Sequence, residues 1–246
     1  FAMTYYTDKK DFNPVLIAED AAGNVRKGSF WYHANGKTYR HDRINISDRF
    51  LNTKMPQFEG DYPGLPSQVQ LFLKVNRELR KKNRAELHRA AKETSPTFLF
   101  EGSFNRLPNA ATRAQFGDKR SYYYSGKVID KQTHLGIDLA STRQAPIPAA
   151  NNGRVVLAES DFGIYGNAVI IDHGLGLQTL YSHLSQIDVA PGDMVAKGQI
   201  IGKTGATGMA GGDHLHYGVI CAGIPVNPVE WWDGRWIKNN ITSKLK

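Results

Sequence analysis

Short runs rich in Val and Ile, separated by turns that contain Gly, constrain the fold of the C-terminal half of this chain more than any other feature. Several short strands at regular spacing are typical of all-β domains. We therefore predict a mainly β fold, with an antiparallel sheet that carries a groove across one face. The five runs are Arg154–Leu157, Ala168–Ile171, Gln178–Tyr181, Gln199–Ile201 and Leu215–Val219.

Two motifs place metal-binding side chains on one face of an extended segment. Side chains alternate between the two faces of a strand, so His134 and Asp138 share a face, as do His214 and His216. Neutral imidazole and carboxylate are ligands that suit zinc. Two such strands side by side would collect these groups on one wall. The spacing therefore predicts a transition-metal site, with zinc as the favoured ion.

His183 is a fifth candidate for the same site. A catalytic zinc ion keeps three protein ligands and leaves one position for water. Five bound side chains would close the site, so we expect at least one histidine to be free for proton transfer. No His-Glu-x-x-His motif is present, which excludes the helical zinc-protease arrangement. His173, where a buried run ends in a turn, is expected to be structural.

An ordered series of motifs between residues 112 and 230 resembles the M23 family of zinc metallopeptidases, the lysostaphin and LytM-type enzymes that cut peptide cross-bridges of bacterial peptidoglycan. The series includes segments around both histidine motifs and several Gly-containing turns. Its members are Phe116–Arg120, His134–Ala140, Pro148–Val156, Gly166–Gly174, Leu180–Leu184, Pro191–Gly202, Gly205–Gly208 and His214–Gly218.

The resemblance implies a role for each candidate residue. His134, Asp138 and His216 match the three zinc ligands of the family, with one Zn2+ per chain. His214 matches the general base, and His183 matches the histidine that stabilises the oxyanion or holds substrate, although either imidazole could accept the proton. The intact ligands argue against the alternative of a catalytically idle or latent LytM-type protein that binds the cell wall or activates an amidase.

The resemblance also implies an M23/LytM-type catalytic domain and a zinc-dependent endopeptidase acting on peptidoglycan peptides. We expect the bond between D-Ala and diaminopimelate rather than a glycine bridge, because no SH3-like wall-targeting domain is found. Pro191–Gly202 also resembles the turn of biotinyl and lipoyl carrier domains, but such carriers have no histidine cluster. Trp231, Trp232 and Trp236 are expected to pack a C-terminal tail rather than to stack on sugars.

The N-terminal half has a different pattern. Asn35-Gly36, between Phe30–His33 and Lys37–Tyr39, is a strong hairpin signal. From Ser67 to Thr94 apolar residues recur among strong helix formers, which predicts one long amphipathic helix. We therefore expect a small β-rich region at 1–65, a helical connector at 66–100, and the metallopeptidase domain with its tail at 101–246. The N-terminal region could position substrate or block the groove.

The net charge of +8 favours a polyanionic partner, and a cell-wall polymer with carboxylates fits better than nucleic acid, for which no recognition motif is present. The excess is concentrated in one segment, which is expected to be the solvated face of the helix. Its basic residues are Lys74, Arg77, Arg80, Lys81, Lys82, Arg84, Arg89 and Lys92.

No run of about 18 apolar residues occurs, so no transmembrane segment is expected. The chain begins with Phe1 and shows no secretory signal; a membrane anchor or export signal would lie outside it. The lone Cys221 cannot form an internal disulfide. The resemblance implies location in the periplasm or cell envelope.

Overall fold

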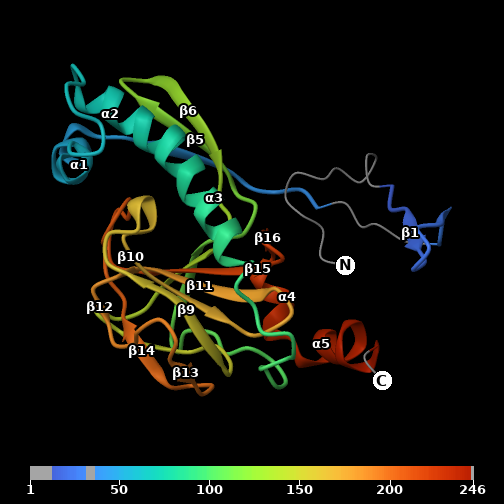
Figure 1. Ribbon diagram of the computed structural model, residues 1–246. Helices are drawn as coiled ribbons and strands as arrows, with labels where there is room; N and C mark the ends of the chain where they lie inside the picture. The colour runs from blue at the N-terminus through green and yellow to red at the C-terminus, as the bar shows by residue number, and fades with distance from the viewer. Residues whose placement is uncertain (1–12, 32–36, 245–246) are drawn as a thin grey trace.

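The computed structural model describes residues 13–31 and 37–244, and strands form most of its body (Figure 1). The largest sheet, called the main sheet here, has the order β13-β9-β10-β11-β15-β7-β4, with β16 paired to β15. All its strand pairs are antiparallel, so the predicted fold class is confirmed. Its strands are β4 (Ala111–Ala114), β7 (Ile137–Ala140), β9 (Gly153–Glu159), β10 (Asn167–Asp172), β11 (Leu177–Leu184), β13 (Met194–Val195), β15 (Leu215–Cys221) and β16 (Ile224–Val226).

Three smaller sheets accompany the main sheet. One is the hairpin β1 (Leu16–Glu19) and β2 (Val25–Gly28). A second has the order β12-β14-β8, with β8 (Pro146–Pro148), β12 (Gln186–Ile187) and β14 (Ile200–Lys203). The third has the order β3-β5-β6, with β3 (His41–Asn45), β5 (Lys119–Tyr124) and β6 (Lys127–Thr133).

Hydrophobic residues cover both faces of the main sheet. In β10, Ala168 and Ile170 pack into one core, whereas Val169 and Ile171 pack into the other. This alternation is what a strand buried on both sides requires. The first core also contains Phe72 from the helical segment that lies across this face of the sheet (Figure 1). The second contains Trp231, which is 5% exposed, so packing of the C-terminal tail is confirmed at this residue.

The predicted long helix is present as a continuous helical segment from residue 68 to 90. It consists of α2 (Gln68–Lys74), a π-helical turn (Val75–Leu79) and α3 (Arg80–Ala90). Ser67 caps its start by accepting a hydrogen bond from the Gln70 backbone N–H. Shorter helical elements are α1 (Asp48–Lys54), α4 (Pro228–Trp232), α5 (Gly234–Asn240) and the 3-10 turns Pro56–Phe58, Gly163–Tyr165 and Thr242–Lys244.

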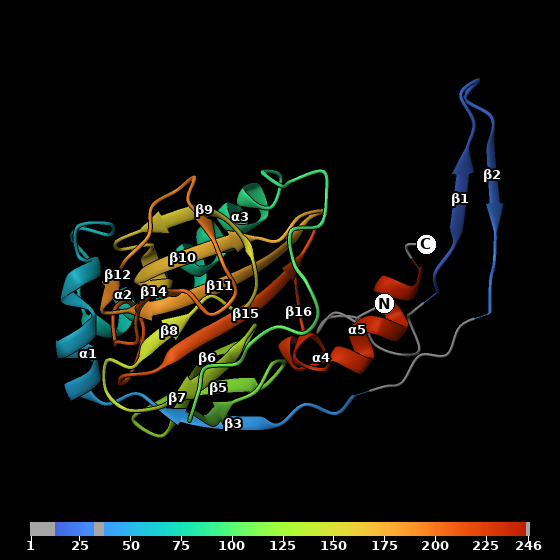
Figure 2. The same ribbon diagram turned by 90° about the horizontal axis from the view of Figure 1, so that it is seen from below.

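The N-terminal region contributes to two separate sheets. The β1–β2 hairpin projects away from the body (Figure 2), and all eight of its strand residues are exposed. β3 instead pairs in parallel with β5, so a strand from the expected N-terminal region joins two strands from the expected catalytic domain. The hairpin predicted at Asn35-Gly36 lies outside the described residues. The division into 1–65, 66–100 and 101–246 remains a prediction.

No helix in the described part of the chain is both long enough and apolar enough to cross a membrane.

Candidate metal centre

Asp138 and His216 come together because β7 pairs with β15. The two residues are direct cross-strand partners in this antiparallel ladder. His134 does not lie on the strand of Asp138, contrary to the prediction that both occupy one strand. β6 ends at Thr133 and β7 begins at Ile137, so His134 lies where the chain crosses from the β3-β5-β6 sheet to the main sheet. Its backbone is held by Asp118 and Gly117.

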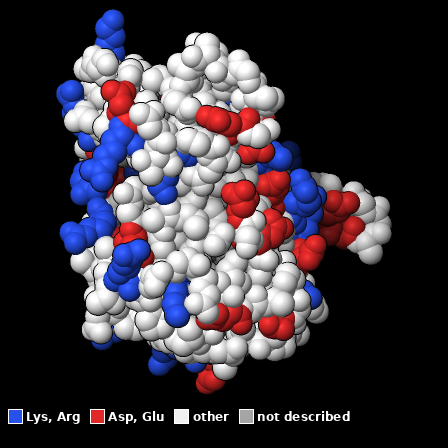
Figure 3. All heavy atoms as spheres, turned by 90° about the vertical axis from the view of Figure 1, so that its left-hand side faces the viewer, with Lys and Arg blue, Asp and Glu red and all other residues white. Residues whose placement is uncertain are grey.

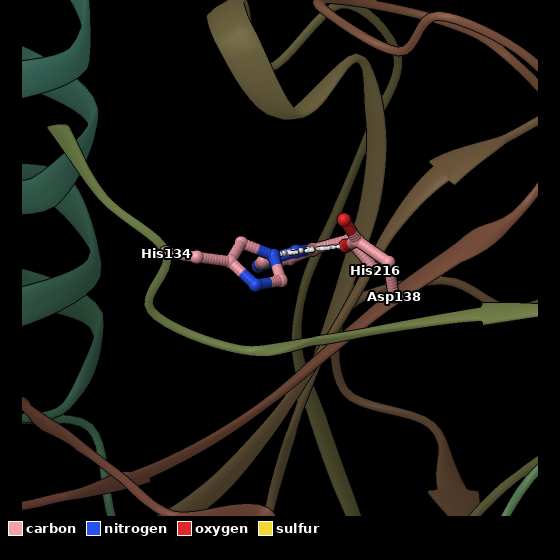
Figure 4. Close-up of side chains that lie close together, drawn as sticks. All are labelled: His134, Asp138 and His216. Atoms are coloured by element: carbon pink, nitrogen blue, oxygen red, sulfur yellow. Dashed lines mark hydrogen bonds and ion pairs between the residues drawn. The ribbon is translucent and has the colours of Figure 1, made fainter. Parts of the chain in front are cut away.

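The three predicted zinc ligands converge on one point (Figure 4). His134 Nε2 lies 2.9 Å from Asp138 Oδ1, His216 Nδ1 lies 2.9 Å from the same oxygen, and the two nitrogens are 2.9 Å apart. Two atoms that each bind one zinc ion at about 2.0–2.1 Å can be at most about 4 Å apart. The three donors therefore fit a single ion.

The hydrogen bonds of His134 provide a second test of this fit. His134 Nδ1 lies 2.9 Å from the carbonyl oxygen of Gln115, which can only accept a hydrogen bond. A neutral His134 therefore carries its proton on Nδ1 and directs the Nε2 lone pair toward His216 Nδ1 and Asp138 Oδ1. Three electron-rich atoms at this separation require a proton or a cation between them. A metal ion would satisfy that requirement, and it would be buried, because His134 is 5% and His216 7% exposed.

Arg120 orients the carboxylate of Asp138. Its Nη2 donates to Asp138 Oδ2 at 2.9 Å, which leaves Oδ1 directed at the two histidines. Burial opposes ionisation of Asp138, but positive charge on His134 and hydrogen bonds from the histidines hold its pKa well below the ordinary value, and a metal ion at this point would supply the same positive charge. The carboxylate is therefore ionised and oriented for metal binding. Arg120 belongs to the matching motif Phe116–Arg120, but its role at the site was not predicted from the sequence.

The two predicted catalytic histidines lie beside this group. The rings of His183 and His214 are 4.9 Å apart between centroids, and His183 is 5.9 Å from the His216 ring. His183 Nδ1 lies 2.9 Å from the Thr207 carbonyl oxygen, and His214 Nδ1 lies 2.8 Å from that of Gly212. Each neutral ring therefore has its Nε2 lone pair free of the protein backbone. All five predicted site residues are thus brought together.

Burial and nearby charges affect the two rings in opposite ways. Burial of His183, together with its histidine neighbours, lowers its pKa well below the ordinary value. Burial also opposes protonation of His214, but Asp138 outweighs this effect and raises the pKa of His214. His214 Nε2 lies 3.6 Å from Asp138 Oδ1, so the attraction is electrostatic rather than a short hydrogen bond.

A cavity of about 470 Å³ opens onto all five residues. Part of its wall comes from the N-terminal half, including Ile44–Ser47 and Phe50. Tyr122 lines it together with Tyr165. No local signal marked these N-terminal residues, because they reach the site only through the pairing of β3 with β5 and the packing of the helical segment.

The prediction that the basic residues of the helical segment form one solvated face is wrong for Arg80. Lys81 and Lys82 are exposed, but Arg80 is partly buried and lines the cavity. Burial by tertiary contacts, which helical periodicity alone does not report, explains the difference. On the face shown in Figure 3, Lys and Arg gather along one edge and Asp and Glu toward the other, so this face carries no uniform positive patch.

His173 has the structural role expected for it. It is fully buried, and its Nδ1 and Nε2 lie 2.7 Å from the Asn152 carbonyl oxygen and 2.8 Å from Thr179 Oγ1. Burial lowers its pKa to about 4. Both ring nitrogens are engaged in hydrogen bonds, so the ring is neutral and unavailable to a ligand.

Comparisons with known proteins agree with this geometry. The model of peptidase family M23 matches residues 132–228. The chain is 40% identical over 131 residues to the DD-carboxypeptidase/endopeptidase Mpg of Neisseria meningitidis, covering 52% of this chain and 29% of that protein. It is 41% identical over 97 residues to the peptidoglycan DD-endopeptidase ShyA of Vibrio cholerae, covering 39% of this chain and 22% of that protein. The chain thus spans less than a third of these relatives.

A solved structure shows the same fold. A crystal structure assigned to peptidase M23 from Pseudomonas aeruginosa superposes with a TM-score of 0.53 and 29% sequence identity, covering 64% of this chain and 62% of that one. The chain therefore contains a peptidase M23 domain, matched over residues 132–228.

Proposed function

We propose that this protein is a zinc-dependent endopeptidase that hydrolyses peptide cross-links of bacterial peptidoglycan, at the bond between D-Ala and diaminopimelate. One observation carries the proposal. Three donor atoms at mutual distances of 2.9 Å share a cavity with two further histidines whose Nε2 atoms are not bonded to backbone. This arrangement combines a three-ligand metal site with separate proton-transfer groups.

The protein residues have distinct tasks in this reaction. His134, Asp138 and His216 would hold the zinc ion, which would act as a Lewis acid and lower the pKa of water. Arg120 fixes the orientation of Asp138 by donating to its Oδ2. We assign His214 as the general base, because its Nδ1–H is held by Gly212 and its Nε2 can accept a proton and return it to the leaving amine.

His183 is assigned to the substrate carbonyl. While its Nδ1–H is donated to Thr207, a neutral His183 has no Nε2–H. Its lowered pKa keeps the ring neutral, so it can donate to a developing oxyanion only in the other tautomer, with the proton on Nε2. A neutral His183 could instead accept the proton from water. Measuring pH–rate profiles for His183→Ala and His214→Ala would show which substitution removes the fall in rate at low pH that a general base produces.

The names of the relatives support the substrate. ShyA and a second Vibrio cholerae protein, ShyB, are both named peptidoglycan DD-endopeptidases, and ShyB is 34% identical over 134 residues. A DD bond joins two D-configured centres, as the bond between D-Ala and diaminopimelate does. We also propose the periplasm or cell envelope as the location, because that is where this substrate lies.

The test is digestion of purified sacculi. Sacculi with direct D-Ala–diaminopimelate cross-links and sacculi with glycine bridges are incubated with the protein, with and without a chelator, and the released muropeptides are identified. We expect cleavage of the direct cross-links, loss of activity with chelator, and recovery with zinc. Absence of release from either substrate by zinc-loaded protein would contradict the proposal. Release only from glycine-bridged sacculi would contradict the assigned bond.

Two variants test the division of roles. His216→Ala should lose bound zinc and activity together, whereas His214→Ala should retain zinc and lose turnover. His41→Ala, at an exposed histidine outside the cavity, serves as the matched control and should match the wild type. Equal zinc content and full activity in both site variants would refute the assignment.

A further inference from the structure

Arg80 is a cation in the wall of the active-site cavity that the peptidase roles above do not use. It is the first residue of α3 and is partly buried. Arg80 lines the same cavity as His134, Asp138 and His216. Other basic residues of this helical segment, such as Lys81, are exposed to solvent. Arg80 is therefore directed toward the site while its neighbour faces water.

The hydrogen bonds of Arg80 hold it in place without neutralising it. Its Nε lies 3.2 Å from both the backbone carbonyl and Oδ1 of Asn76, and its Nη2 lies 2.6 Å from the same Oδ1. Asn76 is itself fully buried and donates from Nδ2 to Asp130 Oδ2 at 2.7 Å. That donation directs the amide oxygen of Asn76 toward Arg80, so Asp130 fixes Arg80 indirectly.

No carboxylate of the described residues lies within ion-pairing distance of Arg80. By contrast, Arg77 in the preceding turn pairs with Asp130 at 3.0 Å. Asp138 is the only acidic residue that lines the cavity within 13–31 and 37–244, and its Oδ2 is bound by Arg120. Arg120 therefore pairs with the acidic residue of the cavity, and Arg80 has no carboxylate partner among the described residues.

Partial burial of a guanidinium that has no ion-pair partner costs free energy, because the charge loses part of its hydration. Burial accordingly lowers the pKa of Arg80 from its ordinary value, although an arginine stays charged at neutral pH. A carboxylate brought into the cavity would relieve this cost, since a guanidinium forms paired hydrogen bonds with both carboxylate oxygens.

We propose that Arg80 binds a free carboxylate of the peptide substrate and so makes the enzyme selective for peptides that carry one near the scissile bond. This inference rests on the proposed peptidase function. Cross-linked wall peptides offer two such groups, the carboxylate on the diaminopimelate side chain and the C-terminal carboxylate. Arg80 is a specificity residue in this scheme, whereas the five residues around the metal perform the hydrolysis.

The test compares peptides that differ only in charge. Three synthetic cross-linked peptides are used: one with both carboxylates free, one amidated at diaminopimelate, and one amidated at the C-terminus. kcat/KM is measured with the zinc-loaded wild type, Arg80→Met, Arg80→Lys and the control Lys81→Gln. Lys81→Gln removes one positive charge from the same helix without altering the cavity wall. Thermal melting checks that each variant is folded.

For the wild type we expect amidation of one carboxylate to lower kcat/KM by about tenfold to a hundredfold, the range of one charge-assisted hydrogen-bond pair. In Arg80→Met, kcat/KM for the fully charged peptide should fall to the value that the wild type shows with the amidated peptide. Amidation of the carboxylate that Arg80 binds should then lower kcat/KM no further. Arg80→Lys should keep part of the preference, and Lys81→Gln should keep all of it. The amidation that lowers kcat/KM of the wild type but has no effect on Arg80→Met identifies the carboxylate that Arg80 binds.

Two outcomes would overturn the inference while leaving the peptidase function intact. Equal cleavage of all three peptides by the wild type would show that no carboxylate is selected. An equal fall for charged and amidated peptides in Arg80→Met would show that Arg80 only supports the cavity wall. Failure of the wild type to cleave any peptide or sacculus would instead count against the proposed function.

Discussion

Gly136→Ala is expected to weaken metal binding without removing a ligand. Gly136 lies between His134 and Asp138, and a Cβ built there would be 2.6 Å from His216 Cε1, 2.7 Å from His216 Nε2 and 2.6 Å from the backbone oxygen of Tyr217. Ordinary carbon contacts are about 3.5–4.0 Å, so either the imidazole or the strand must move by about 1 Å. β15 is paired on both sides near this point, by β7 and β11, so the His216 imidazole and the backbone at residue 136 are the groups expected to move.

The size of the effect follows from the geometry of the ligand triangle. A shift of about 1 Å exceeds the roughly 0.5 Å tolerance of a functional constellation. We therefore expect zinc affinity to fall by at least tenfold to a hundredfold, as for other losses of ligand orientation, and hydrolysis to fall with it. Overpacking should also lower the free energy of unfolding by about 1–3 kcal/mol.

The assay is a competitive zinc titration against a chromophoric chelator, with peptide hydrolysis measured on the same samples. Gly60→Ala is the matched control, because a Cβ at Gly60 meets no atom within 4 Å. Circular dichroism establishes that both variants are folded. A Gly136→Ala protein that is folded and binds zinc as tightly as the wild type would refute the claim that these three side chains form the metal site.

Three further outcomes are expected. Arg120→Met should weaken zinc binding by roughly tenfold to a hundredfold, because Asp138 loses the group that orients Oδ2; a titration showing unchanged affinity would contradict this. His183→Ala should retain zinc while hydrolysis falls, and metal analysis showing loss of the ion would place His183 among the ligands. The metal-free protein should become less stable as pH falls from about 6.5 toward 4, because His173 has a native pKa of about 4 and binds protons more readily when unfolded. Between pH 7 and 5 this residue lowers the free energy of unfolding by about 2 kcal/mol. Denaturant titrations should show that the free energy of unfolding falls less with pH in His173→Gln than in the wild type. An identical pH dependence in the two proteins would exclude the contribution of His173.

The sequence by itself determined the β architecture and the five chemical groups of the site. Alternation of apolar residues reports which faces of a strand are buried, as in β10, where neighbouring residues pack into opposite cores. The spacing of His214 and His216 likewise reports a shared face. His134 and Asp138 were paired correctly for a different reason, since the chain between them crosses between sheets rather than continuing as one strand.

Only the tertiary structure decided what surrounds those groups. Arg120 and Asp138 are joined by an ion pair between different sheets, and Arg80 reaches the cavity because the helical segment packs across the main sheet. Residues 44–47 reach it through the parallel pairing of β3 with β5. Local periodicity specifies which way a side chain faces on its own element, but it carries no information about which distant element that face will meet. The partners of the site, and the charge left unmatched in its wall, therefore appear only when the chain is folded.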